Sequence, residues 1–473
     1  MKLSLQEILD ATGGTLLSGS AASEISSVSI DSRSIGESCL FVPVRGETND
    51  GHDYIEKALN GGAVASLTSE REAFDYYEDN HEANEKAFVL VNDTVRALQA
   101  IGKAARMKSR ALSVGVTGSV GKTTTREMIA RALMPAGEVY ATSKNYNNRL
   151  GVPLTLLAMP EDADFAVLEL GMDVPGELGD ISALTNLSAA VITNIGDAHT
   201  EYYGSRERIA EEKMTVTRGF WPDSGIKHVM FLNGDDPMLM KYRNSSLYET
   251  VTFGLEPGSD YTAFGLHSEN GCYVFDFQRK GETLLNVRLS ALGRHNVLNA
   301  LSALAVADRF SVNLQAAAES ISSFTGFKGR LERREKNGIL VIDDTYNASP
   351  ASMTAGVKVL SELSYGDGTG RKIAVLGDML ELGDQEEKMH YDVGLELSSL
   401  PVDEYFFVGK LSGRIREGLL NGGTRAVLRM PEPAEDVLET LKETLLPGDS
   451  VYLKASRVVK LNRISEALTE DET

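Results

Sequence analysis

Cysteine is scarce in this sequence, and its scarcity excludes several kinds of site. The two cysteines, Cys39 and Cys272, stand far apart and form no CxxC motif or Cys/His pairing. That excludes a cysteine-based zinc site and a disulfide framework, and it is typical of a reducing compartment. Long apolar runs are missing as well, since none approaches the roughly 20 residues that cross a bilayer. We therefore expect a cytoplasmic protein without membrane insertion.

Basic residues are also few compared with acidic ones. The 473 residues include 47 Lys+Arg against 68 Asp+Glu, which gives a formal net charge of −21. A protein that binds the phosphate backbone of nucleic acid needs a basic face, so this composition excludes a general nucleic-acid partner. Any anionic ligand must be held locally by a few cations, by backbone amides or by a metal ion.

The length and the pattern of elements predict an α/β protein of three domains. Short mixed elements over residues 1–94 predict a small α/β domain. Residues 95–325 predict a central domain of the phosphate-loop type with a mostly parallel sheet. Residues 326–473 alternate regularly between strand and helix patterns, which predicts a Rossmann-like, doubly wound domain.

Apolar patterning places several strands of the central domain. The segments 165–170 and 189–195 are continuously apolar, which predicts parallel strands buried on both faces. Residues 272–290 alternate between apolar and polar side chains and predict an antiparallel hairpin at one edge of the sheet.

A glycine-rich loop follows the first strand of the central domain. The sequence TGSVGKTTT lies after an apolar run and before a helical pattern, the order that opens a βαβ unit. Glycines let backbone N–H groups turn toward a polyphosphate, Lys122 can neutralise the β- and γ-phosphates, and the Thr123 hydroxyl can bind Mg²⁺. Val116 replaces the first glycine of the strict GxxxxGK[ST] pattern, yet the flanking elements favour an ATP or GTP site over a chance turn. The predicted nucleotide-binding residues of this loop are Gly118, Ser119, Val120, Gly121, Lys122, Thr123 and Thr124.

Two further polar side chains follow strands of the same predicted sheet. Glu169 lies at the end of the 165–170 strand, and His199 lies just after the 189–195 strand. Because the carboxyl ends of parallel strands face the ligand, both could converge on the phosphate loop. A carboxylate is a natural Mg²⁺ ligand, whereas His199 could equally be an ordering hydrogen-bond partner. Lys213, taken alone, indicates only a solvated helix lysine.

Nine motifs together resemble the Mur ligase family over nearly the whole chain. They are DSRSIGESCLFVPVRGETNDGHDYI, TGSVGKTTT, NYNNRLGVPLTLL, LELGMDVPGEL, NIGDAHTEYYGSRERIAEEK, LGRHNVLNALSALA, GFKGRLE, DDTYNASPASM and VLGDMLELG. Each motif alone is weak, but nine in the order of the family make coincidence implausible. The phosphate loop of that family reads TG[ST]xGK[ST][ST], so Val116 is expected there.

The resemblance implies an ATP-dependent amide ligase. The family converts the terminal carboxylate of a UDP-muramoyl peptide into an acyl phosphate, which an amine attacks with release of phosphate. Phosphate is a far better leaving group than a carboxylate oxygen, so most of the catalysis is positioning and charge neutralisation. DDTYNASP and NYNNRLGVP favour the reaction that adds D-alanyl-D-alanine to UDP-N-acetylmuramoyl tripeptide during peptidoglycan synthesis. We expect a monomer.

Two alternatives stay open. A sister ligase could add a single amino acid, although the DNPR-type segment of the diaminopimelate-adding enzyme is absent. A non-catalytic nucleotide-binding regulator is the other alternative. The joint presence of Lys122, Glu169, His199 and Lys213 argues against it.

The resemblance also implies roles around the phosphates. Lys122 resembles the lysine that contacts the β- and γ-phosphates, and Thr123 and Glu169 resemble ligands of a first Mg²⁺. His199 resembles the ligand of a second Mg²⁺. Lys213 matches a lysine that is carbamylated in several members and then lies beside the metal.

For the nucleoside, Asn296 and Asn299 resemble an adenine-contacting pair, although a helix cap and a polar helix face would also explain them. Arg330 resembles a phosphate-facing arginine and Asp344 a ribose-binding acid. Both belong to the third domain while the loop belongs to the second, so catalysis would need domain closure.

The resemblance further implies a set of substrate-facing residues. For those in the polar turn DSRS, an ordinary connection between strands is the alternative. The whole set is Ser32, Arg33, Asn49, His52, Asn147, Asn148 and Asn347. Two departures concern the third domain: Ser349 stands where the family often has asparagine, and Lys454-Ala455-Ser456 replaces a KGS sequence. They affect details of recognition of the incoming amine and leave the reaction class unchanged.

Overall fold

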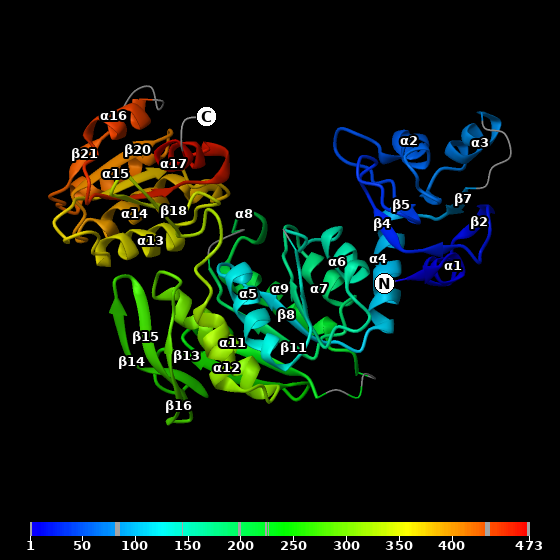
Figure 1. Cartoon of the computed structure of the whole chain (residues 1–473), viewed down its shortest axis with the longest axis horizontal. Coiled ribbons are helices and arrows are strands. Elements are labelled where there is room, and N and C mark those ends of the chain that lie inside the picture. The colour runs from blue at the N-terminus through cyan, green and yellow to red at the C-terminus, as the bar shows by residue number, and fades with distance from the viewer. Residues whose placement is uncertain are drawn as a thin grey trace.

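The structure is a computed structural model that describes residues 2–80, 86–143, 145–196, 200–222, 225, 227–430 and 436–470. Figure 1 shows three α/β bodies that follow one another along the chain, each built around its own sheet. Within the described ranges, no helix combines the length and the apolar character needed to cross a membrane.

The N-terminal body is a small α/β unit. Its elements are β1 (Leu3–Ser4), α1 (Leu5–Thr12), β2 (Thr15–Ser18), β3 (Glu24–Ile25), β4 (Ser27–Ser29), β5 (Cys39–Phe41), α2 (Ile55–Asn60), β6 (Ala65–Thr68), α3 (Arg71–Asn80) and β7 (Ala87–Leu90). The main sheet has the order β2-β7-β6-β5-β4, in which β2 runs antiparallel to β7 and the other pairs are parallel. Apolar clusters cover both of its faces.

The central body carries the phosphate loop. Its elements are α4 (Thr94–Lys108), β8 (Leu112–Thr117), α5 (Lys122–Leu133), β9 (Val139–Ala141), α6 (Gly151–Ala158), β10 (Phe165–Glu169), α7 (Glu177–Ser182), β11 (Ala189–Ile192), α8 (Thr200–Tyr203), α9 (Arg206–Met214), β12 (Val229–Asn233), α10 (Pro237–Met240), β13 (Glu249–Gly254), β14 (Tyr261–Glu269), β15 (Cys272–Arg279), β16 (Glu282–Arg288), α11 (His295–Arg309) and α12 (Leu314–Ser322).

The sheet of the central body is mostly parallel, as predicted. Its order is β16-β15-β14-β13-β12-β11-β8-β10-β9, and every pair from β14 to β9 is parallel. β14, β15 and β16 pair antiparallel at one edge, which confirms the predicted hairpin. β8 lies between β10 and β11, so the phosphate loop leaves the sheet beside the ends of both.

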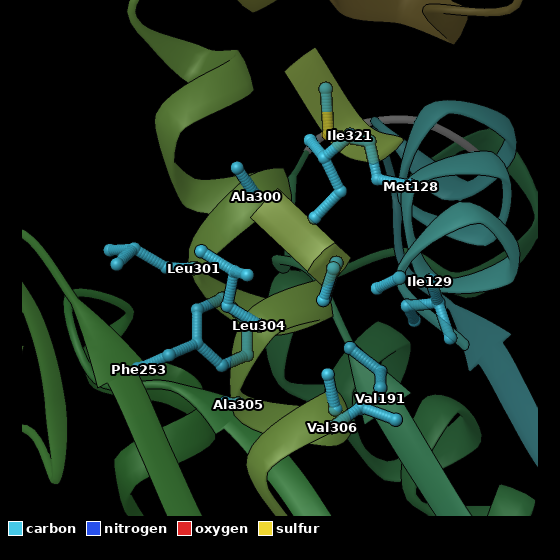
Figure 2. Packing of buried hydrophobic residues seen from close by; sticks show 14 of the residues in the cluster. Met128, Ile129, Val191, Phe253, Ala300, Leu301, Leu304, Ala305, Val306 and Ile321 are labelled. Atoms are coloured by element: carbon cyan, nitrogen blue, oxygen red, sulfur yellow. The ribbon is translucent and has the colours of Figure 1, made fainter. Parts of the chain in front are cut away.

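The core of the central body fixes where the phosphate loop lies. Figure 2 shows side chains of α5 and α11 meeting over the sheet, with Met128 and Ile129 from α5 and Leu304 from α11. Complete burial of such a side chain contributes roughly 1.5–3 kcal/mol. Residues of the opposite register, such as Leu168, face the second cluster on the other side of the sheet. Burial on both faces explains the continuous apolar segments.

Helix α4 joins the first two bodies. Leu98 and Ile101 belong to the apolar cluster of the N-terminal sheet, and Leu157 of α6 belongs to the same cluster. The two helices touch at Gly102, where a Cβ atom would lie only 2.8 Å from the Cα of Pro153. The boundary that we place at residue 94 stays a prediction.

The C-terminal body is doubly wound, as the alternating pattern predicts. Its elements are β17 (Glu332–Lys336), β18 (Ile339–Asp343), α13 (Pro350–Glu362), β19 (Lys372–Gly377), α14 (Glu386–Leu397), β20 (Glu404–Val408), α15 (Ser412–Asn421), β21 (Val427–Arg429), α16 (Asp436–Thr444), β22 (Ser450–Lys454) and α17 (Asn462–Thr469). The sheet order is β17-β18-β22-β19-β20-β21, and apolar clusters cover both faces.

β17 was not predicted. It pairs antiparallel with β18 at the edge of an otherwise parallel sheet. Its sequence ERREK has no apolar residue, so no hydrophobic pattern marks it as a strand. Charged side chains of this kind suit an edge strand because they discourage pairing with other chains.

Candidate active site

The phosphate loop has the glycine-dependent shape that its sequence predicts. Gly118 has a φ of +146°, and a Cβ there would lie 1.9 Å from the Oγ1 of Thr193. Gly121 has a φ of +87° at the start of α5. The Thr193 hydroxyl donates to the carbonyl of Val120 at 2.6 Å, and the Val120 N–H donates to the Oδ1 of Asn194 at 2.9 Å. The end of β11 therefore holds the loop in place.

Lys122 begins α5 and its ammonium group lies over the loop. Its Nζ donates to the carbonyl of Gly118 at 2.7 Å. Burial lowers the pKa of Lys122; the Glu169 carboxylate opposes this, and the Arg330 cation lowers the pKa further. Lys122 thus lies within electrostatic reach of a carboxylate of its own body and an arginine that follows the linker to the C-terminal body.

Glu169 ends β10 and provides a buried carboxylate beside the loop. Only 4% of the residue is exposed. Its Oε1 accepts hydrogen bonds from the Thr123 hydroxyl at 3.2 Å and from the Nδ2 of Asn147 at 3.0 Å. Its Oε2 is buried and has no hydrogen-bond partner among the described residues. A buried, unpartnered carboxylate oxygen is costly, and a bound cation would satisfy it.

Lys213 lies on α9 and is buried, with 1% of the residue exposed. Its Nζ lies 3.6 Å from the Sδ of Met172, and in the described ranges no carboxylate forms an ion pair with it. Burial lowers the pKa of Lys213 well below its ordinary value, and the charge of Lys122 adds to this. The interpretation of Lys213 as a solvated helix lysine is therefore wrong. His199 lies outside the described residues.

Asn296 and Asn299 are buried on α11, close to the phosphate loop. The Nδ2 of Asn299 donates to the Oδ1 of Asn296 at 2.8 Å, and Asn296 in turn donates to the carbonyl of Leu292 at 2.7 Å. The Thr125 hydroxyl donates to the Oδ1 of Asn299 at 3.0 Å. These contacts tie α11 to α5 directly behind the loop. Contact of the two asparagines with adenine stays a prediction.

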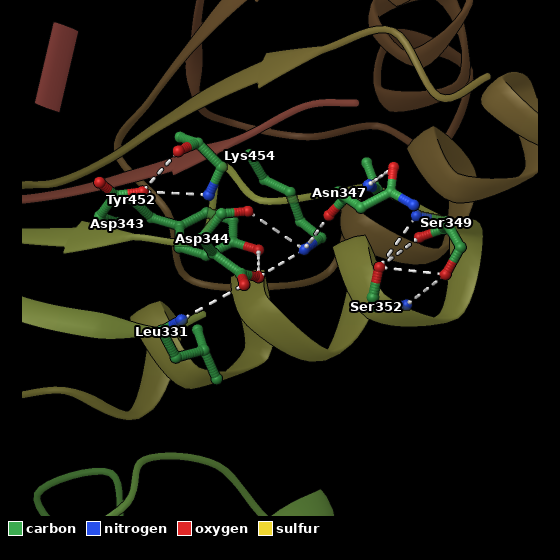
Figure 3. A network of polar contacts seen from close by, with 10 residues as sticks. Leu331, Asp343, Asp344, Asn347, Ser349, Ser352, Tyr452 and Lys454 are labelled. Atoms are coloured by element: carbon green, nitrogen blue, oxygen red, sulfur yellow. Dashed lines mark hydrogen bonds and ion pairs between the residues drawn. The ribbon is translucent and has the colours of Figure 1, made fainter. Parts of the chain in front are cut away.

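Asp344 follows β18 in the C-terminal body and belongs to the polar network of Figure 3. Its Oδ2 accepts hydrogen bonds from the Nζ of Lys454 at 2.6 Å and from the hydroxyl of Tyr452 at 2.9 Å. Its Oδ1 accepts from the N–H of Leu331 at 3.3 Å. Both carboxylate oxygens are thus engaged within the protein. The predicted contact with ribose stays a prediction.

Arg330 lies between the central and C-terminal bodies. Its guanidinium carbon lies 4.1 Å from the ring centroid of Tyr346. In the described part of the chain this guanidinium forms no ion pair, although it lies close enough to Lys122 to lower the pKa of that lysine. Asn347 is exposed, and its Oδ1 accepts from the N–H of Ala348 at 2.9 Å.

The predicted substrate-facing residues of the N-terminal body lie on turns. Ser32 and Arg33 lie in one turn, where the guanidinium of Arg33 binds Asp31 at 2.9 and 2.8 Å. This hydrogen bonding lowers the pKa of Asp31 to about 2. Asn49 is exposed and its Nδ2 donates to the Thr48 hydroxyl at 3.3 Å. Their contact with the UDP group stays a prediction.

Two other predicted substrate residues have structural contacts. His52 is buried; its Nδ1 lies 2.7 Å from the Oδ1 of Asp50, and its Nε2 accepts from the N–H of Ser69 at 3.2 Å. The Oδ1 of Asn148 accepts from the N–H of Gly151 at 2.9 Å and so holds the start of α6. Asn147, by contrast, reaches Glu169 as described above.

Sequence reasoning gave no role to Tyr346 and treated Lys454 only as part of a departure from the family pattern. The structure makes Tyr346 the platform of Arg330 and Lys454 the counter-ion of Asp344. Both follow or end strands of the doubly wound sheet, where ligands bind in this fold class. Their position at the strand ends was the available signal.

A phosphate loop with a buried carboxylate at a strand end, joined to a doubly wound domain, defines a multidomain nucleotide-dependent enzyme. The chain belongs to the Mur ligase family. It matches the family's catalytic domain over residues 24–109, the Mur ligase middle domain over 116–307 and the glutamate ligase domain over 329–457.

One curated relative and two solved structures are similar over nearly the whole chain. A UDP-N-acetylmuramoyl-tripeptide–D-alanyl-D-alanine ligase from Bacillus subtilis (strain 168) is 38% identical, over 99% of each chain. A solved structure of MurF from Acinetobacter baumannii has a TM-score of 0.87 at 29% identity and covers 100% of this chain and 99% of that one. A structure of MurF ligase from Thermotoga maritima in complex with ADP has a TM-score of 0.78 at 30% identity, with 93% and 96% covered.

Proposed function

We propose that this protein is an ATP-dependent ligase that adds D-alanyl-D-alanine to UDP-N-acetylmuramoyl tripeptide. The reaction would be a cytoplasmic step of peptidoglycan precursor synthesis, carried out by a monomer. The observation that carries the proposal is the convergence of Lys122, Glu169 and Lys213 around the phosphate loop of a Mur ligase, with Arg330 within electrostatic reach.

The charge of the reacting groups sets the task of the site. A carboxylate of the tripeptide must approach the γ-phosphate of ATP, and both are anions. Lys122 lies over the phosphate loop and is suited to neutralise the β- and γ-phosphate oxygens. Arg330 adds a second cation next to it, supplied by the segment that leads into the C-terminal body. The two side chains would stabilise the charge that is shared during phosphoryl transfer.

Thr123 and Glu169 would hold Mg²⁺, because a hydroxyl and a carboxylate are the oxygen ligands that this ion prefers. The unpartnered Oε2 of Glu169 fits that role. When bound, Mg²⁺ would neutralise phosphate charge. Asn147 donates to the Oε1 of Glu169 and would orient the carboxylate.

Lys213 would be carbamylated. Its lowered pKa favours the neutral amine, which is the form that reacts with CO₂. The amine nitrogen forms a bond to the carbon of CO₂ and releases one proton, so a buried potential cation becomes an anion. That group would lie in the neighbourhood of Lys122, and with His199 it would complete the second Mg²⁺ site. Rescue of Lys213→Ala by a short carboxylic acid would support this role, whereas rescue only by a short amine would contradict it.

The same residues would serve the amide-forming step. Phosphorylation of the tripeptide carboxylate creates an acyl phosphate, whose phosphate departs when the amine of D-alanyl-D-alanine attacks the carbonyl carbon. Lys122 and Arg330 would stabilise the charge on the departing phosphate. The amine would come from the C-terminal body, so that body must close on the phosphate loop.

A phosphate-release assay tests the proposal. The protein would be incubated with ATP, Mg²⁺, UDP-N-acetylmuramoyl tripeptide and either D-alanyl-D-alanine or a single amino acid such as D-alanine, lysine or diaminopimelate. We expect phosphate release with the dipeptide only. Release with a single amino acid but not with the dipeptide would indicate a sister ligase, and no release with any amine would favour a regulator. The variant Lys122→Met is the matched negative control.

A further inference from the structure

Two arginines share one aromatic ring at the junction of the central and C-terminal bodies. The guanidinium carbon of Arg330 lies 4.1 Å from the ring centroid of Tyr346, and that of Arg457 lies 5.7 Å from the same centroid. In the described part of the chain neither guanidinium forms an ion pair with a carboxylate. In a chain with a net charge of −21, two uncompensated arginines on one ring point to anionic ligands.

Arg457 lies where the C-terminal body would bind a ligand. It begins a short 3₁₀ turn, Arg457–Val459, directly after β22. Tyr346 follows β18 and Leu380 follows β19, and the sheet order β18-β22-β19 makes these strands neighbours. The Ser456 hydroxyl accepts from the N–H of Leu380 at 2.9 Å, which draws the last two strand ends together. Ligands of doubly wound domains bind at the carboxyl ends of such strands.

The chemistry of the strand ends matches a small peptide acid. A guanidinium that lies over an aromatic ring keeps the N–H groups at its edge free, and these can bind a carboxylate through two parallel hydrogen bonds. Two exposed apolar residues are near Arg457: Val458 follows it directly, and the backbone of Leu380 bonds to the preceding Ser456. The C-terminal residue of D-alanyl-D-alanine offers one carboxylate and one methyl group.

We propose that Arg457 binds the C-terminal carboxylate of the incoming dipeptide and that Tyr346 holds its guanidinium in place. Arg330, on the same ring but within electrostatic reach of Lys122, serves the phosphate. The ring of Tyr346 thereby links the cation for the phosphate to the cation for the dipeptide. This inference rests on the proposed ligase function and adds a residue that determines which amine is accepted.

The test compares two amine substrates that differ in one charge. Initial rates would be measured with D-alanyl-D-alanine and with its C-terminal carboxamide, for the wild-type chain and for Arg457→Gln. We expect the KM of the wild-type chain for the carboxylate to be lower by about ten-fold or more, as for a charged hydrogen bond. Arg457→Gln should raise the KM for the carboxylate to the level of the carboxamide, and should leave the KM values for ATP and the tripeptide unchanged.

Two further variants complete the test. Arg457→Lys keeps the charge and should retain part of the preference for the carboxylate. Arg416→Gln removes an exposed arginine from α15 of the same body and should behave as the wild-type chain does. Arg457 is exposed, so both of its variants are expected to fold, and circular dichroism checks this.

The outcomes separate the inference from the proposed function. If the wild-type chain releases no phosphate with D-alanyl-D-alanine, the proposed function fails. If the wild-type chain is active and Arg457→Gln keeps its full preference for the carboxylate, the inference alone is wrong. An increase in the KM for ATP without a change for the dipeptide would also overturn it, because Arg457 would then serve the nucleotide.

Discussion

Two buried polar clusters of this molecule differ in whether their ionisable groups have partners within the protein. In the C-terminal body, Asp344 receives hydrogen bonds from Lys454, Tyr452 and the backbone, so each of its oxygens has a partner. In the central body, Glu169 has a buried oxygen without a partner among the described residues, and Lys213 forms no ion pair with any of them.

This difference indicates which cluster has a structural role and which cluster binds ligands. A buried ionisable group without a partner lowers stability, so it is retained where function requires it. In a buried ion pair, removal of either partner lowers stability strongly. We infer that the Asp344 cluster positions the strand ends of the C-terminal body. The cluster of Glu169 and Lys213 is arranged for ligands that arrive with their own charge.

The largest effect is expected at Lys122. The variant Lys122→Met should lower kcat for phosphate release by roughly 10²–10³-fold or more, because a preorganised cation at the γ-phosphate is lost. Its thermal unfolding midpoint should change little, because the ammonium group of Lys122 bonds to carbonyl groups of the phosphate loop and not to another element of the core. A large loss of stability, or full activity in the folded variant, would contradict this assignment.

The Asp344 cluster should show the opposite behaviour, in stability. Lys454→Met leaves Asp344 buried and without its counter-ion, and should lower the free energy of unfolding by about 3–5 kcal/mol. Chemical denaturation measures this loss. The double variant Lys454→Met with Asp344→Asn should recover part of it, since no unpaired charge remains. Equal losses in the single and double variants would show that the ion pair is not the cause.

Lys213→Met should stabilise the protein and abolish its activity. In protein depleted of CO₂, where Lys213 carries no carbamate, the buried amine has no ion-pair partner among the described residues and costs stability. An apolar side chain of similar size should recover about 1 kcal/mol or more at neutral pH. The folded-state pKa lies below the ordinary value, so the unfolded chain binds more protons between the two pKa values. The contribution of Lys213 to the stability of the wild-type chain should therefore rise with pH up to about 10.5.

The gain from Lys213→Met should shrink across the same pH range. Denaturation at neutral pH and near pH 10 measures this, with the exposed Lys410→Met as the control. A gain that does not depend on pH would mean that Lys213 is not a buried titrating amine. If Lys213→Met destabilised the protein, the contrast between the Asp344 cluster and the cluster of Glu169 and Lys213 would be wrong.

The smallest effect is expected at the exposed pair of Asp31 and Arg33. Arg33→Gln should let the pKa of Asp31 return from about 2 toward its ordinary value, which NMR titration of the carboxyl can follow. Any stability from this pair is present at neutral pH and is lost as the pH falls through about 2. The unfolding midpoint at neutral pH should barely change, because exposed ion pairs contribute little. A clear drop would show that pairing at the surface matters as much as burial.

The sequence predicts the fold well where the signal is apolar. The continuous apolar segments 165–170 and 189–195 predict strands buried on both faces, and β10 and β11 confirm this. β17 was missed because its side chains are charged and its place depends on β18 alone.

The candidate site is predictable only in part, because contacts between distant segments leave no local signal. Glu169 follows from its place at a strand end. The burial of Lys213 depends on how α9 packs, and the stacking of two arginines on Tyr346 depends on three strands meeting.

The central claim is that the Glu169 carboxylate, whose Oε2 has no partner among the described residues, is a ligand of the Mg²⁺ that binds with ATP. Calorimetric titration of a non-hydrolysable ATP analogue, with and without Mg²⁺, tests it most directly when the wild-type chain is compared with Glu169→Gln. We predict that Mg²⁺ strengthens binding to the wild-type chain, and that Glu169→Gln folds but loses most of that strengthening. An undiminished effect of Mg²⁺ in Glu169→Gln would contradict the claim.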